Sequence, residues 1–225
     1  PPRQFHRVHW KALHRALHTL PTGIRTWRCK FVTGCSSVCS QLRHRGHFES
    51  AACPLCGAPI EKASHVLTCP DQGATAAANS LYTTDLNTTL VALETHKTLT
   101  TSLSKLFLLA RQGSPVSANS FPRAVHKAIQ DQARIGWSNF LIGRWSIEWA
   151  NLQGAHYRII GSRKSGLVWQ ASVLTTLIQG QWHLWDYRNQ RFRGDQGTVA
   201  IEEHRRLNDR IAAEFGLRWD GLTQV

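Results

Sequence analysis

The sequence contains no methionine, few acidic residues and no long apolar run. Because no stretch of about 18 apolar residues occurs, no segment is predicted to cross a membrane. The chain begins Pro1-Pro2-Arg3, with neither an initiator Met nor an apolar leader, so we expect a fragment of a longer intracellular protein. The 225 residues include 14 Asp and Glu against 27 Lys and Arg, which gives a net charge of +13.

The signatures of two classes of metal-dependent enzyme are also missing. None of the three tyrosines precedes an acidic pair, so the Tyr-x-Asp-Asp turn with which polymerases hold two Mg²⁺ ions is absent. A nuclease site beginning at Pro70-Asp71 lacks the Asp/Glu-x-Lys string that would complete it. The acids that could hold a nuclease metal instead are Asp186, Asp195, Glu202 and Glu203. Acids at helix starts are ordinarily solvated, so we expect no catalysis by this segment and keep a metal-dependent endonuclease as the lesser alternative.

Four metal-ligand side chains follow the pattern Cys-x2-Cys-x8-His-x3-Cys: Cys53, Cys56, His65 and Cys69. Two thiolates separated by two residues can chelate one ion from a tight turn, and His65 and Cys69 lie on one face of a helical turn. Three sulfurs and one imidazole fill a tetrahedron and leave no open position, which predicts a structural Zn²⁺ site. The alternative is a set of buried free cysteines that happen to be close in sequence.

A second group of cysteines, Cys29, Cys35 and Cys39, precedes this pattern, with His44 and His47 nearby. Their spacing is irregular and contains no Cys-x2-Cys chelate. A second zinc site is therefore one interpretation, and small buried hydrophobic side chains are the favoured one.

The positive charge is concentrated around the cysteines. Residues 1–50 carry nine Lys and Arg against Glu49 alone, and residues 119–195 carry ten against four acids. Clustered cations bind a polyanion by releasing its counterions, so RNA or DNA is the expected partner. A membrane surface is not the expected partner, because the sequence has no strongly basic amphipathic helix with a clean apolar face. The predicted contacts are Arg25, Arg28, Lys30, Arg43 and Arg45, together with Arg163 and Lys164 in the turn GSRKSG.

Apolar residues recur at three- and four-residue steps, which predicts a mainly α-helical fold of bundle-like segments with one small CCHC zinc knuckle. Helices are predicted over 5–20, 74–94, 97–111, 123–153, 167–191 and 198–215, with irregular loop and short elements over 24–50. Gly136 and Gly143 weaken the fourth helix, which we expect to be kinked or split. Tryptophans expected in the core are Trp27, Trp145, Trp149, Trp169, Trp182 and Trp185.

Three parts are predicted: a basic segment with the knuckle over 1–72, a helical hairpin and linker over 73–118, and a helical C-terminal domain over 119–225.

The string CPLCGAPIEKASHVLTCP resembles the zinc knuckle that follows the polymerase domain in reverse transcriptases of non-LTR (LINE-like) retrotransposons. In that pattern Cys-Pro-x-Cys-Gly is followed by an acidic residue, here Glu61, and by His-hydrophobic-hydrophobic-x-Cys-Pro. The upstream run from Trp27 to Gly34 is similar to the Trp–Lys–Gly run that precedes the knuckle in such tails. The resemblance implies binding of template RNA or target DNA, a polymerase domain on the N-terminal side in the same polypeptide, and a nuclear location.

These observations predict a non-catalytic, nucleic-acid-binding C-terminal region of a retroelement reverse-transcriptase-like protein. The alternative is a protein-interaction scaffold in which the zinc knuckle holds two helical parts together. Dependence of binding on salt separates the two, because only a polyanion releases counterions on binding.

Overall fold

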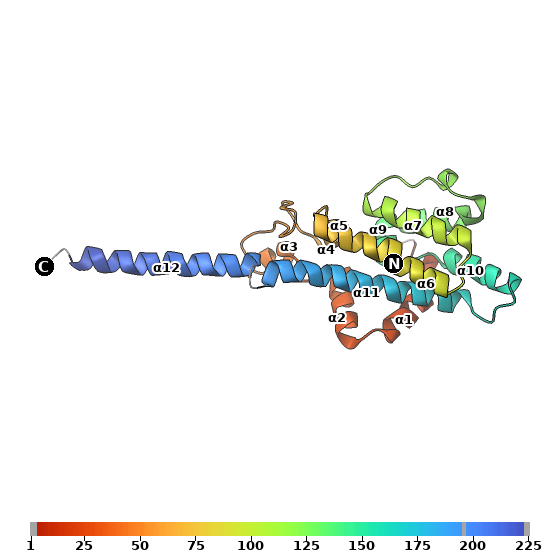
Figure 1. The fold of residues 1–225 in the computed structure, drawn as a ribbon, viewed down its shortest axis with the longest axis horizontal. Coiled ribbons are helices and arrows are strands. Elements are labelled where there is room, and N and C mark those ends of the chain that lie inside the picture. The colour runs from red at the N-terminus through yellow and green to blue at the C-terminus, as the bar shows by residue number, and fades with distance from the viewer. Residues whose placement is uncertain (1–3, 195–196, 223–225) are drawn as a thin grey trace.

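The computed structural model describes residues 4–194 and 197–222, and its elements are helices joined by turns and loops (Figure 1). The mainly α-helical fold class is confirmed, and within the described ranges no strand is found beyond an isolated bridge between Val8 and Ser146. The α-helices are α1 (Trp10–Thr19), α2 (Thr22–Val32), α3 (Cys39–His44), α4 (Ala63–Thr68), α5 (Gln72–Asn79), α6 (Leu86–Ala92), α7 (Lys97–Arg111), α8 (His126–Ile135), α9 (Trp137–Leu141), α10 (Ile147–Ile159), α11 (Gly166–Arg193) and α12 (Thr198–Leu222).

The long helix α11 is the axis of the fold. It contacts α1, α2, α4, α5, α6 and α10, and most of its length is buried among them (Figure 1). Its buried side chains lie on several faces, as is typical of a helix enclosed by others. By contrast, α12 continues beyond α11 and projects away from the body of the molecule (Figure 1).

One hydrophobic cluster contains residues from each of the three predicted parts, for example Trp27, Leu106 and Trp185. The predicted division at 72 and 118 stays a prediction, but the three parts share this core. Of the tryptophans expected inside, Trp182 is half-buried and the other five are buried. Trp27 packs against Trp182 and Trp185 of α11, with ring centroids 5.3 and 6.3 Å away, so it rests on the long helix.

Residues 24–50, predicted as irregular loop with short elements, contain more helix than expected. This stretch contains α2 and α3, because apolar side chains such as Phe31 and Leu42 bury themselves against distant parts of the chain, which outweighs weak local helix propensity. The predicted 123–153 helix is split at Gly136 (φ +102°) and Gly143 (φ +73°), as expected for a backbone conformation that glycine adopts most readily. The backbone of α12 stays helical past the predicted end at Gly216, to Leu222.

The crossing of α10 and α11 depends on a glycine with no space for a side chain. A Cβ added at Gly166 would lie 1.9 Å from the backbone oxygen of Ala150, whereas one at Gly154 would meet neighbours no closer than 3.6 Å. We expect Gly166→Ala to lower the free energy of unfolding by about 1–3 kcal/mol through overpacking. The matched control Gly154→Ala should be neutral or stabilising by up to about 1 kcal/mol, because Ala favours helix. Urea denaturation of both variants measures the difference, and equal stabilities would contradict this packing.

Candidate metal centre

The structure brings the four predicted ligands together. One ligand atom from each of Cys53, Cys56, His65 and Cys69 lies within 4.8 Å of the other three. The Sγ atoms of Cys53 and Cys69 are 3.8 Å apart, and Cys56 Sγ lies 3.3 Å from His65 Nε2. The four side chains are therefore close in space as well as in sequence, and the cluster could hold a metal ion.

Two local elements position the ligands. Cys53 and Cys56 lie in a tight turn in which the Gly57 N–H donates to the Cys53 carbonyl at 2.9 Å. The Cys53 N–H in turn donates to the Ala58 carbonyl at 2.8 Å, which closes the loop. His65 lies within α4 and Cys69 directly follows that helix, so one short helix fixes the other two ligands. The local sequence thus encodes the site almost completely.

Partly buried hydrogen bonds hold the chain around Cys69 and Asp71. Arg111 on α7 donates from Nη2 to the Cys69 carbonyl at 2.9 Å, and Asp71 caps α5 by accepting from the Ala74 N–H at 2.9 Å. Burial raises the pKa of the Cys69 thiol to about 12 and also raises the pKa of Cys53. Since a metal binds the thiolate, a cation that binds these side chains displaces their protons. Asp71 thus caps α5, and in the described residues it belongs to no group of three or more potential metal ligands.

A buried ion pair joins the knuckle (residues 51–70) to α11. Glu61 is 0% exposed and Arg188 is 1% exposed. The Arg188 Nε donates to Glu61 Oε1 at 2.8 Å and its Nη2 to Oε2 at 2.5 Å. The Cys39 N–H also donates to Glu61 Oε2 at 2.7 Å, and Cys39 Sγ accepts from Arg188 Nη2 at 3.2 Å. One carboxylate and one guanidinium therefore connect α3, the knuckle and α11.

Sequence reasoning missed this pair. Arg188 lies within α11, which continues to Arg193, and its guanidinium is buried 4.3 Å from the centroid of the Phe192 ring. Glu61 was noted only as an acidic position of the motif. A charged residue in an apolar helix face, such as Arg188 between Trp185 and Phe192, was the available signal that a buried partner exists.

The second cysteine group does not assemble. Among the described residues, the cluster above is the one group of three or more potential ligands close enough for a metal ion. Cys39 is buried, as the favoured interpretation expected, and burial raises the pKa of its thiol to about 12. Cys29 and Cys35 are exposed, so the expectation of buried hydrophobic side chains is wrong for these two.

Some of the predicted nucleic-acid contacts are exposed, and others are engaged by groups of the protein itself. Arg28, predicted as a phosphate contact, is not available to a phosphate because it is only 3% exposed. It donates to Gln181 Oε1 at 2.7 Å and to the Ile142 carbonyl. Burial lowers its pKa to about 10. Lys164 is exposed but pairs with Glu94 at 2.7 Å. Arg25 is half-buried, with Nη2 2.9 Å from Thr22 Oγ1. The exposed predicted contacts are Lys30, Arg43, Arg45, Arg163 and Lys164.

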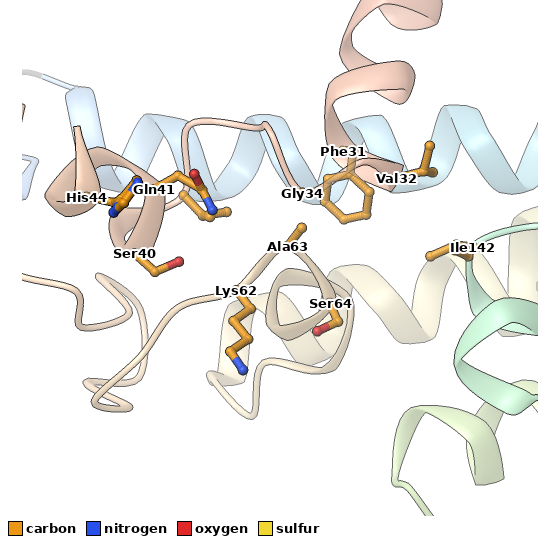
Figure 2. A pocket seen from close by; sticks show the side chains of 11 residues that line it. Phe31, Val32, Gly34, Ser40, Gln41, His44, Lys62, Ala63, Ser64 and Ile142 are labelled. Atoms are coloured by element: carbon orange, nitrogen blue, oxygen red, sulfur yellow. The ribbon is translucent and has the colours of Figure 1, made fainter.

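Three hollows surround the knuckle and its neighbours. The first, of about 570 Å³, lies between α2, α3 and α4 and is lined by His44 and Lys62 among others (Figure 2). The second, of about 380 Å³, lies between α4, α7 and α9. The third, of about 540 Å³, is lined by Arg45, His47 and Arg193. The residues described along these hollows include no Asp or Glu.

The acids considered for a nuclease metal do not gather in the part of the chain that the structure describes. Asp186 is exposed and accepts from Gln190 Nε2 at 3.0 Å, and Glu202 pairs with Arg206 at 3.2 Å. Glu203 is exposed on α12. Asp195 lies outside the described residues. As for membranes, none of the helices in residues 4–194 and 197–222 has a stretch long and apolar enough to cross a bilayer.

Comparison with known proteins gives no family for this chain: no family model, curated protein or solved structure that was compared matches it.

Proposed function

We propose that the cluster binds one Zn²⁺ as a structural ion. Tetrahedral zinc with Zn–S bonds of about 2.3 Å requires sulfurs about 3.8 Å apart, and shorter Zn–N bonds of about 2.0 Å bring sulfur and nitrogen slightly closer. The Cys53–Cys69 and Cys56–His65 separations, 3.8 and 3.3 Å, fit these values. Three thiolates and one imidazole are the donor set that zinc prefers, and they leave no position for a substrate. Zinc here holds the fold of the knuckle and performs no chemistry.

We propose further that the chain is a non-catalytic nucleic-acid-binding region organised by this knuckle. The observation that carries the proposal is the charge of the surroundings: cationic side chains line two of the three hollows around the knuckle, and the described lining residues include no carboxylate. Lys30 on α2 and Arg43 on α3 are also exposed, and Arg45 directly follows α3 and lines the third hollow. A surface of one sign attracts a polyanion along its whole length, so RNA or DNA fits it better than a protein partner of mixed charge.

The resemblance of residues 53–70 to retroelement knuckles supports the wider context of this proposal. By that resemblance, the region follows a reverse-transcriptase domain of the same polypeptide and positions template RNA or target DNA in the nucleus. The polymerase chemistry then belongs to the preceding domain, because the Tyr-x-Asp-Asp turn is absent from these 225 residues.

Charge reversal near the knuckle tests the binding function. We expect Arg43→Glu/Arg45→Glu to weaken binding of RNA or DNA by about tenfold or more and to reduce the slope of log affinity against log salt by about 2. The matched control is Lys97→Glu/Arg158→Glu, which changes the charge equally at exposed sites on α7 and α10. Fluorescence anisotropy across a salt series measures both. Binding that is insensitive to salt, or reduced equally by both pairs, would favour another function.

A protein-interaction scaffold is the second candidate, and α12 is the feature that favours it. Ile201, Leu207 and Ile211 on this projecting helix are 63%, 51% and 44% exposed. Exposed aliphatic side chains on one helix are a common means of protein contact. Retention of nucleic-acid binding after deletion of residues 198–225 would separate this contact from the binding function of the basic surface.

A further inference from the structure

We propose, on the basis of the function above, that the nucleic acid recognised is single-stranded and that its track is the hollow between α2, α3 and α4 together with the adjoining hollow at α9. The phosphates lie against His44 and Lys62 at the first hollow, and a base stacks on Trp137 at the second. The track takes RNA or DNA alike, because phosphates and base faces are common to both.

The first hollow has the shape and chemistry of such a track. Phe31 and Ala63 lie at its centre, with His44 at one end and Ile142 at the other (Figure 2). Lys62 extends outward from the wall formed by the start of α4 (Figure 2). The side chains of Lys62 and His44 are exposed, and no ion pair in the described residues engages Lys62. A cation without a carboxylate partner is available to neutralise a phosphate.

The second hollow continues from the first. Ser64 and Ile142 line both, so the two spaces meet at this point. Trp137, the first residue of α9, lines the second hollow and is only half-buried. Its ring packs edge-on against Phe140, with centroids 5.5 Å apart at 72°, which fixes its orientation. A fixed, partly exposed indole beside a cationic hollow combines the two components of single-strand binding, a stacking platform and a phosphate-binding surface.

The concave cationic surface suits a single strand better than a duplex. Proteins that read duplex DNA insert a projecting helix or ribbon into a groove, whereas the cationic surface here is concave. In the described structure α12 is the helix that projects (Figure 1), and residues 198–222 carry five acids against four Lys and Arg. A net negative helix is repelled by the phosphates on either side of a groove. Concavity, an aromatic side chain and the location of the cations therefore all favour a single strand.

The track also explains why a structural metal is placed here. Helix α4 forms the wall shared by both hollows: Ala63 lines the first, Leu67 and Thr68 line the second, and Ser64 lines both. The same six-residue helix carries His65 of the metal cluster. Isolated helices this short are unstable in water, so the metal and the core contacts of Val66 and Leu67 hold the wall in place.

The test is fluorescence anisotropy with a labelled, unstructured single strand of about 12 nucleotides, within the usual site size, and with a duplex of equal length. We expect Trp137→Ala to weaken strand binding roughly 5- to 150-fold, the range for loss of one base–aromatic stack, and Trp137→Phe to restore most of it. Lys62→Glu should weaken binding and reduce the salt slope by about 1. Trp10→Ala, another half-buried tryptophan on α1, is the control and should bind like the unaltered protein.

Each outcome separates this proposal from the more general one. If the unaltered protein binds neither probe, the nucleic-acid function itself is wrong. If it binds the strand with normal salt dependence, but Trp137→Ala and Lys62→Glu bind equally well, the function stands and this track is wrong. Tighter binding of the duplex than of the strand would also overturn the track. Because Lys62 is exposed, its variant is expected to fold even where Trp137→Ala does not, and thermal unfolding of each variant checks this.

Discussion

Removal of the metal is expected to unfold residues 51–70 while α11 and the helices around its N-terminal half stay folded. Structural Zn²⁺ contributes roughly 10–16 kcal/mol to small zinc modules, as much as the whole stability of an ordinary domain. Cys53, Cys69 and Ala74 form a small apolar cluster of their own, separate from the main core. Loss of the ion leaves this cluster with too little apolar surface to remain ordered, and the six-residue helix α4 then keeps only the core contacts of Val66 and Leu67, which are too few for so short a helix.

Chelation followed by amide hydrogen exchange measures this loss segment by segment. Fast exchange is expected over α4 and the Cys53–Gly57 turn, with slow exchange retained in α11. Cys56→Ser should reproduce the effect, and Cys35→Ser is the matched control because Cys35 is exposed and outside the cluster. Metal analysis should find one zinc per chain. A ratio of two would restore the second site, and unchanged exchange after complete metal removal would show that the cysteines pack without an ion.

The cluster of four potential ligands was predictable because its geometry is local. All four ligands fall within residues 53–69, where a tight turn and one helical turn are enough to bring them together. The interruption of the predicted 123–153 helix was equally local, since Gly136 and Gly143 are the residues at which the backbone adopts positive φ. In both cases the sequence neighbours determine the structure, so pattern and spacing contain the necessary information.

The features that escaped prediction depend on partners far along the chain. Arg28 was counted among the phosphate contacts, but Gln181, 153 residues away, accepts from it in the interior. The helix α2 that carries Arg28 forms because Trp27 and Phe31 pack against the tryptophans of α11. No single window of sequence contains both members of these pairs. The sequence therefore shows which segments carry the positive charge, whereas only the fold decides which cations face solvent.

Arg188→Met is expected to destabilise the protein by about 3–5 kcal/mol, the usual cost of leaving one charge of a buried pair without its partner. Glu61 would keep the Cys39 N–H as a donor but lose both bonds from the guanidinium. Arg191→Met removes an exposed cation from the same helix and should change stability by no more than about 0.5 kcal/mol. Urea denaturation of the metal-loaded protein measures both, and equal stabilities would contradict a structural role for the pair.

The double variant Glu61→Gln/Arg188→Met distinguishes attraction between the charges from the cost of burying them. The amide that replaces the Glu61 carboxylate is neutral and still offers an oxygen to the Cys39 N–H, so no buried charge is left without a partner. We expect the double variant to regain most of the stability lost by Arg188→Met, because paired buried charges gain little over neutral groups. It should also retain one zinc, since neither residue is a ligand, but bind nucleic acid less tightly if the pair fixes α3 against the knuckle. Full nucleic-acid affinity in the double variant would mean that zinc and the apolar core alone set the shape of the basic surface, and that the ion pair serves folding only.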